Sequence, residues 1–236
     1  LRTRLMEIGV YRASGHEHFS GCLVIPLFDA GGQVVGLYGR RIDRTAPPPK
    51  HLYLPGPHRG VFNRQGLGGE EVIVCEALID ALTFWCAGMR NVTSAYGVEG
   101  VTDELVEALV AAGAKRVMIA FDRDEAGDKG AEKLSVRLGE EGIETFRVLF
   151  PRGMDANAYA RKVAPSDKAL ELAVRQAVWM RAGKTAKAST LATPATTAAT
   201  PEAAPEESGP SSLEQGGGLV GLGPEEIPSL VAEAAP

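Results

Sequence analysis

Short apolar runs alternate with longer amphipathic stretches through residues 70–150. The four predicted strands are EVIVCE, NVTSAYG, RVMIAFD and ETFRVLF, and the three predicted helices are ALIDALTFWCAG, TDELVEALVAAGA and EAGDKGAEKLSVRLGEEG. Thr102 is placed to cap the second helix, and Gly88 and Gly113 follow the first two helices as terminators. Each strand is almost continuously apolar, which is typical of a parallel sheet with helices on both faces. The pattern therefore predicts an α/β domain.

The first 69 residues follow a different pattern. The apolar runs CLVIPLFD and VVGLYGRRI are joined by AGGQ, which predicts a β-hairpin because Gly31 and Gly32 tolerate the positive φ of a tight turn. TAPPPK then interrupts regular structure before the extended stretch HLYLPGPHRGVFN. We expect residues 1–69 to form a small subdomain that is mostly β or α+β.

The composition changes towards the C-terminus. Residues 163–183 contain a predicted helix from Asp167 to Arg181, and residues 184–236 are rich in Ala, Thr, Pro, Ser, Gly and Glu. The last segment cannot bury enough apolar surface to offset its ordering entropy, so we predict a disordered tail. The expected organisation is a subdomain at 1–69, the α/β domain at 70–162, a helix at 163–183 and the tail at 184–236.

The acidic net charge belongs to the tail. The whole chain carries −5, and residues 184–236 contain two Lys and seven Glu, which leaves 23 basic and 23 acidic residues in the body. A neutral body can bind nucleic acid only where its basic side chains cluster apart from its acidic ones. The net charge therefore neither identifies nor excludes a nucleic-acid partner.

Cysteine spacing and hydropathy argue against a zinc-binding protein and against a membrane-spanning one. Cys22, Cys75 and Cys86 lack the spacing of zinc ligands and lie in apolar runs, so we expect them to be buried. No apolar run approaches the ~18 residues that a membrane span needs. A cytoplasmic location without a membrane partner is therefore expected.

Acidic residues follow three of the four predicted strands. They are Glu76 after the first strand with Asp80 one helical turn later, Asp122 and Asp124 after the third, and Asp155 after the fourth. The carboxyl ends of parallel strands meet at one edge of a sheet, with neighbours about 5 Å apart, so these carboxylates should converge. Such a cluster repels itself unless a cation compensates it, and oxygen ligands without Cys or His suit Mg²⁺ or Mn²⁺.

Helix capping is the simpler explanation for any one of these acids. Asp124 in particular could cap the helix that begins at Glu125. Capping does not explain why five acids follow three strand ends, and a shared metal site does.

Two segments of the α/β domain resemble a known signature. VIVCEALID, followed about 40 residues later by IAFDRDEAGDKGA, resembles the TOPRIM signature of a Glu after the first strand and Asp-x-Asp-x-x-Gly after the third. TOPRIM domains occur in bacterial primases, topoisomerases, recombination mediators and certain nucleases. The flanks are similar to those of bacterial, DnaG-type primases: LVIPLFDAGGQVVGLYGRRID, PPPKHLYLPG and HRGVF upstream, and FPRGMDANAYAR downstream. The resemblance covers roughly residues 20–162.

This resemblance implies the catalytic core of a DNA primase, a nucleotidyltransferase that makes short RNA primers on single-stranded DNA during DNA replication. It implies metal ligands at Glu76, Asp122, Asp124 and Asp155, and catalytic roles for Glu76, Asp122, Asp124 and the supporting acid Asp80. The residues expected to contact the template backbone or nucleotide phosphates are Arg40, Arg41, Lys50 and Arg59. The implied cofactor is Mg²⁺ or Mn²⁺, and the implied partners are single-stranded DNA, ribonucleoside triphosphates and a replicative helicase.

Three positions depart from the primase pattern. Ala77 and Arg123 replace glycines, and Asn157 replaces the last acid, so that an amide oxygen stands where the family has a carboxylate. The amino-terminal zinc-binding module of full primases is not found in the sequence either. These departures suggest a divergent branch, such as that of a mobile element.

Other functions stay open beside the primase. A TOPRIM nuclease would use the same metal to hydrolyse phosphodiesters, and a non-catalytic replication or recombination module would only bind single strands. The basic residues near position 40 could instead form a solvated edge strand. Some single residues have simpler roles: we expect the histidines of GHEHF in an exposed loop and Trp85 in the core, and neither Tyr96 nor Tyr159 has the context of a topoisomerase nucleophile.

Overall fold

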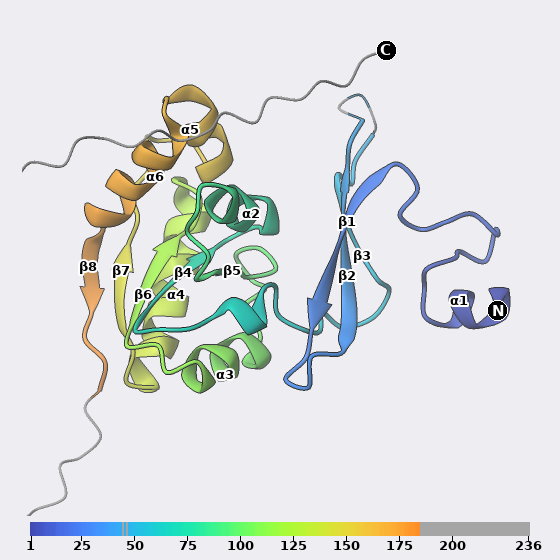
Figure 1. Ribbon diagram of the computed structural model, residues 1–236, viewed down its shortest axis with the longest axis horizontal. Coiled ribbons are helices and arrows are strands. Elements are labelled where there is room, and N and C mark those ends of the chain that lie inside the picture. Colours follow the sequence, from blue (N-terminus) through green and yellow to red (C-terminus); the bar gives the residue numbers. More distant parts are fainter. Residues whose placement is uncertain (44, 46, 185–236) are drawn as a thin grey trace, which may run out of the picture. The chain divides into compact units, whose positions relative to one another are not determined.

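The computed structural model describes residues 1–43, 45 and 47–184. Its larger sheet has five strands in the order β5-β4-β6-β7-β8. The strands are β4 (Glu71–Cys75), β5 (Val92–Ser94), β6 (Arg116–Ala120), β7 (Glu144–Arg147) and β8 (Val178–Arg181). The first four are mutually parallel, as the sequence predicts, and β8 pairs antiparallel with β7 (Figure 1).

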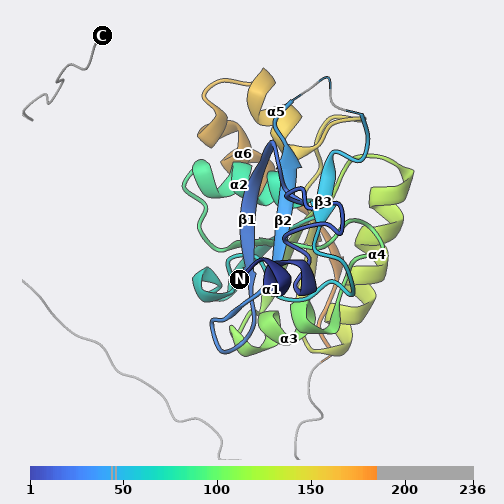
Figure 2. The same cartoon turned by 90° about the vertical axis from the view of Figure 1, so that its right-hand side faces the viewer.

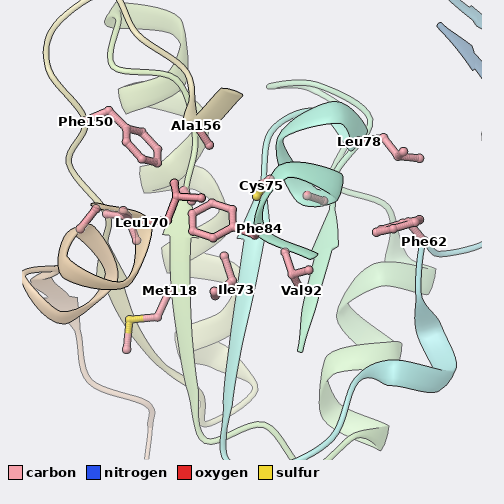
Figure 3. Close-up of a cluster of buried hydrophobic side chains, with 14 of the residues drawn as sticks. Phe62, Ile73, Cys75, Leu78, Phe84, Val92, Met118, Phe150, Ala156 and Leu170 are labelled. Atoms are coloured by element: carbon pink, nitrogen blue, oxygen red, sulfur yellow. The ribbon is translucent and has the colours of Figure 1, made fainter. Parts of the chain in front are cut away.

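Helices cover both faces of this sheet. The helices are α2 (Leu78–Cys86), α3 (Asp103–Ala111), α4 (Glu125–Glu140), α5 (Ala156–Lys162) and α6 (Ser166–Arg175). Side chains of β4 alternate between two apolar clusters, since Ile73 packs with α2, α5 and α6 while Val72 packs with α3 and α4. In the first cluster Phe84 of α2 lies among Ile73 and Met118 of the sheet (Figure 3). This double coverage explains the near-continuous apolar runs of the strands.

The N-terminal subdomain is built on a three-stranded antiparallel sheet (Figure 2). Its elements are α1 (Arg2–Glu7), β1 (Cys22–Phe28), β2 (Val34–Arg41), β3 (His51–Tyr53) and the 3-10 turn η1 (Arg64–Gly66). The hairpin of β1 and β2 is the one that the sequence predicts, with Gly32 at positive φ. Helix α1 lies in a stretch for which no helix is predicted from the sequence.

The two sheets share apolar contacts and hydrogen bonds. Tyr38 of β2 is fully buried in the cluster that also contains Phe84. The Thr93 hydroxyl of β5 donates to the Phe62 carbonyl at 2.7 Å, which fixes the connecting segment to the larger sheet. The N-terminal subdomain therefore packs against the α/β domain.

Four expectations from the sequence are wrong or fall outside the described residues. The helix expected from Asp167 to Arg181 ends at Arg175, because the β-branched and aromatic residues after it pair with the otherwise open edge of β7. Cys86 is exposed and Cys22 is half-buried, whereas Cys75 is buried as expected. Trp85 is 39% exposed and therefore not in the core. Its ring is covered by the Arg90 guanidinium, whose Cζ lies 3.5 Å from the ring centroid. The predicted disordered tail lies outside the described residues, apart from Lys184.

A helix that spans a bilayer must be both long and apolar. Among residues 1–43, 45 and 47–184, none of the helices combines the length and the hydrophobicity required to cross a membrane.

Candidate metal and nucleic-acid site

Glu76 and Asp122 lie at the carboxyl ends of neighbouring parallel strands. Strands β4 and β6 are in register up to Cys75 and Ala120, so the residues that follow them leave the sheet side by side. The backbone N–H of Asp122 donates to Glu76 Oε2 at 3.3 Å. This contact brings together the two predicted ligands that the sequence separates by 46 residues.

The signature glycine explains how α4 can begin so close to Asp122. A Cβ at Gly127 would collide with the carbonyl oxygen of Asp122. The N–H of Gly127 also donates to Asp124 Oδ1 at 2.8 Å. Glycine at this position therefore allows the turn that carries both aspartates to fold back on the helix.

Two of the predicted ligands act as helix caps. Asp124 caps α4 through Oδ1, as the capping alternative proposed, and Asp155 Oδ1 caps α5 by accepting from the Ala158 N–H at 2.5 Å. Each cap uses one carboxylate oxygen and leaves Oδ2 available for another ligand. Capping and metal binding are therefore compatible at these two positions.

Asp80 and Asn157 hold each other between α2 and α5. Asp80 is 4% exposed, and its Oδ1 accepts from the backbone N–H of Asn157 at 3.0 Å. The Asn157 amide donates to the Thr83 hydroxyl at 2.9 Å. Asn157 thus anchors α5 to α2, and its amide nitrogen is turned towards Thr83.

Burial and nearby negative charges raise the pKa of three of the acids, Glu76, Asp80 and Asp122. Burial, followed by the charges of Asp155, Asp122 and Glu76, raises the pKa of Asp80 to about 7. Burial and the charges of Glu76, Asp155 and Asp124 raise the pKa of Asp122 to about 6. Burial is also the main cause of the raised pKa of Glu76. Negative charge is therefore undercompensated at this end of the sheet.

The donor set fits a divalent cation, although the side chains do not form a closed cage. Within the described part of the chain, no three His, Cys, Asp or Glu side chains are grouped closely enough to hold a metal ion as they stand. Three of the acids are instead held apart by local hydrogen bonds. Asp124 and Asp155 cap helices, and Asp80 accepts from Asn157. The hard oxygen ligands and their excess negative charge suit Mg²⁺ or Mn²⁺, which keep several waters. That these residues bind a metal stays a prediction.

The raised pKa of Asp80 predicts a pH dependence of stability in the absence of divalent cations. The folded chain keeps this proton up to about pH 7, whereas an unfolded Asp releases it near its usual 3.8. The native state therefore binds more protons across this window, and the free energy of unfolding should fall as the pH rises from about 4 to 7.

Denaturant titrations in EDTA at pH 5 and pH 8 measure this dependence. Asp80→Asn should reduce the difference between the two values, and Mg²⁺ should stabilise the wild type more at pH 8 than at pH 5. Equal pH dependence in wild type and Asp80→Asn would show that Asp80 titrates normally.

Arg147 is a functional candidate that the sequence analysis missed. It is 6% exposed, and its guanidinium donates to four carbonyl oxygens and one carboxylate under the candidate site. The acceptors are the carbonyls of Ile119 (3.2 Å), Phe121 (2.8 Å), Asp122 (2.7 Å) and Val148 (3.2 Å) and Asp128 Oδ1 (3.0 Å). Its charge opposes the rise in the pKa of both Glu76 and Asp122. A lone arginine inside the apolar run ETFRVLF was the available signal, since buried charges are almost always paired.

The four predicted phosphate-contacting residues all belong to the N-terminal subdomain. Arg40 contacts the His51 ring, and Arg41 Nε donates to the Pro49 carbonyl at 3.0 Å. Lys50 and Arg59 are exposed. The alternative of a basic edge strand is wrong for Arg40 and Arg41, because β2 is the central strand of its sheet.

The remaining single-residue alternatives have structural partners. His18 Nε2 contacts the Tyr53 carbonyl at 2.8 Å, and His16 Nδ1 contacts the Ser14 hydroxyl at 3.3 Å, so the two rings engage separate groups. Tyr159 packs on Phe150 with a centroid distance of 5.7 Å. The Tyr96 hydroxyl donates to the carbonyls of Arg59 and Gly60.

Comparisons with known proteins concern the same part of the chain. Residues 73–160 match a family described as Toprim-like. These residues form a Toprim-like domain. It contains Glu76, Asp122 and Asp155, and its match ends inside α5.

Similar proteins extend the likeness beyond the Toprim-like domain. A DNA primase of Clostridium acetobutylicum is 27% identical over 158 residues, which covers 62% of this chain and 26% of the relative. A DNA primase of Staphylococcus aureus is 27% identical over 161 residues, with 63% and 26% covered. The chain thus spans about a quarter of the length of the curated relatives it matches.

Solved structures show the same fold. The DnaG catalytic core superposes with a TM-score of 0.63 at 22% identity, covering 75% of this chain and 60% of that one. The zinc-binding and RNA polymerase domains of the Aquifex aeolicus primase superpose with a TM-score of 0.59 at 24% identity, covering 70% and 42%. The expected α/β fold, a Toprim-like parallel sheet preceded by a small subdomain, is confirmed.

Proposed function

We propose that this chain is the catalytic part of a DNA primase that joins ribonucleotides on a single-stranded DNA template. The observation that carries the proposal is the contact between Glu76 and the Asp122 backbone at adjacent strand ends of the Toprim-like domain. Similarity to DNA primases that extends beyond that domain favours synthesis over the other reactions of Toprim-like proteins.

The proposed ligands of the cation are Glu76, Asp122, Asp124 and Asp155. A bound Mg²⁺ or Mn²⁺ would activate an attacking 3′-hydroxyl and neutralise charge on the leaving pyrophosphate. In this proposal Asp80 is a supporting acid, held in position by the Asn157 N–H. Arg147 fixes the Asp122 carbonyl and limits the repulsion between Glu76 and Asp122. No covalent protein nucleophile is required.

The proposed substrates are single-stranded DNA and ribonucleoside triphosphates. Arg40, Arg41, Lys50 and Arg59 would hold phosphates, a contact that positions a strand without reading its sequence. One of the similar solved structures is a DnaG catalytic domain bound to single-stranded DNA. A role in DNA replication beside a replicative helicase, in the cytoplasm and on a mobile element, belongs to the same proposal.

Primer synthesis measured beside strand degradation tests the proposal. Labelled ribonucleotides and an unprimed single-stranded template are supplied with Mg²⁺ or Mn²⁺, and the template is labelled in a parallel reaction. We expect products longer than the nucleotides and an intact template. Degradation without synthesis would favour a nuclease, and binding without either reaction would favour the non-catalytic module.

Lys50→Ala should weaken binding to all single strands alike. Lys50 is exposed, and loss of one phosphate contact releases one counterion fewer, so the slope of log affinity against log salt should fall by about 0.7. The matched control is Lys168→Ala, which removes an exposed lysine of α6 that pairs with Glu171. Fluorescence anisotropy over a range of salt concentrations measures both. An unchanged slope in Lys50→Ala would remove Lys50 from the proposed contact.

A further inference from the structure

An aromatic row joins the N-terminal subdomain to the Toprim-like domain. It consists of His51, Tyr38, Tyr53, His58 and Tyr96, with neighbouring ring centroids 4.5 to 5.8 Å apart. The cross-strand pairs Tyr38–Tyr53 and Arg40–His51 of β2 and β3 generate half of it. The row therefore follows from the register of the small sheet together with the loop that leaves β3.

The row ends in a histidine with one open face. His58 stacks on Tyr96 with centroids 4.5 Å apart and planes inclined by 12°. The ring centroid of Tyr53 lies 4.5 Å from that of His58 and 5.5 Å from that of Tyr96. These distances place Tyr53 beside the edge of the imidazole and away from its second face. His58 is exposed, so that second face is available to a planar ligand.

Hydrogen bonds and close packing hold this histidine in place. Tyr96 Oη donates to the carbonyls of Arg59 at 2.7 Å and Gly60 at 2.8 Å, which ties the loop to the Toprim-like domain. Gly36 of β2 permits the approach, since a Cβ there would lie 2.6 Å from the Arg59 carbonyl. The stack is therefore a built feature of the packed chain.

A cavity adjoins the stack. Its volume is about 430 Å³, and its lining includes Tyr53, His58, Arg59, Tyr96 and the first residues of β2. This size lies within the usual range of sites for small ligands, roughly 300–1,000 Å³. An open aromatic face beside an exposed arginine is the combination that binds single-stranded nucleic acid, where bases stack and the cation holds the phosphate.

The segment that carries Tyr96 also contacts the backbone of Glu76. Gly97, next to Tyr96, donates its N–H to the Glu76 carbonyl at 3.0 Å. This hydrogen bond connects the segment that carries Tyr96 to the end of β4.

We propose that the open face of His58, supported by Tyr96, is a stacking site for a nucleobase, with Arg59 holding its phosphate. The base belongs either to the template strand or to a ribonucleoside triphosphate. This inference rests on the proposed function for its biological meaning, but stacking is independent of metal and of synthesis.

Binding of base-containing and abasic strands tests the strand source. An oligothymidylate and an abasic oligomer of the same length and charge are titrated against the full chain in EDTA. His58→Ala should lower affinity for the oligothymidylate roughly tenfold and leave the abasic strand unchanged, because one stacked base is lost. His58→Phe should bind like wild type, and His16→Ala controls for the loss of an exposed histidine.

Fluorescence quenching of 2-aminopurine riboside triphosphate tests the nucleotide source with the same variants. Loss of affinity in His58→Ala in either arm, with recovery in His58→Phe, supports the site and identifies the source of the base. Unchanged binding in both arms, an equal loss on the abasic strand, or failure of His58→Phe to recover would overturn it. Absence of primer synthesis alone would leave these readouts intact and count only against the proposed function.

Discussion

Asp122→Asn should abolish metal-dependent primer synthesis while leaving single-stranded DNA binding intact or stronger. The substitution removes one charge from the pair at the ends of β4 and β6, where Glu76 already contacts the Asp122 N–H. Loss of one group that stabilises a transition state electrostatically costs at least about a hundredfold in rate. Binding should not weaken, because a negative charge near the phosphates disappears.

Steady-state synthesis and strand anisotropy measure the two effects separately. The matched control is Asp167→Asn, which removes an exposed acid from the first turn of α6. Synthesis by Asp122→Asn within a few-fold of the control would exclude Asp122 from the reaction. Equal loss of binding and synthesis would point to a folding defect.

Arg147→Met should destabilise the fold by about 3 kcal/mol, because four carbonyls and Asp128 lose a buried donor. Arg147→Lys should lose less, since it keeps the charge but lacks the planar fork that reaches several acceptors. Arg175→Met is the control, because its pair with Glu171 lies on the exposed surface of α6 and should contribute little to stability.

Denaturant unfolding measures the stability, and Mn²⁺ affinity measures the effect on the site. If Arg147 positions the Asp122 turn, Arg147→Lys should also bind Mn²⁺ about 10- to 100-fold more weakly at a pH where it is fully folded. A variant that is less stable but binds Mn²⁺ normally would reduce Arg147 to a structural role.

Local signals made the Toprim-like domain predictable from the sequence. Thr102 caps α3 through its side chain, and Gly88 and Gly113 have positive φ after their helices. Residues next to each of these helix ends therefore determine where the helix begins or stops. Apolar runs of strand length gave the parallel strands, because both faces of the sheet are covered. The placement of Glu76 and Asp122 after strands was predictable, and the two residues converge because β4 and β6 are neighbours in the sheet.

Features that depend on distant partners could not be predicted in the same way. Strand β8 forms because β7 offers an open edge, and that edge is visible only once the strand order is known. Most acceptors of Arg147 lie at the end of β6 and in α4, between 19 residues (Asp128) and 28 residues (Ile119) away in sequence. The stack of His58 on Tyr96 joins two loops of unrelated sequence. Tertiary packing determines all three.

Divalent-cation binding is the decisive test of the proposed metal site at Glu76 and Asp122. Calorimetric titration of the chain with Mn²⁺ and Mg²⁺, with and without a ribonucleoside triphosphate, reports on the carboxylates whether or not synthesis is observed. We expect a saturable site that is lost in both Glu76→Gln and Asp122→Asn and kept in Asp167→Asn. No binding under any of these conditions, or binding that survives both substitutions, would contradict it.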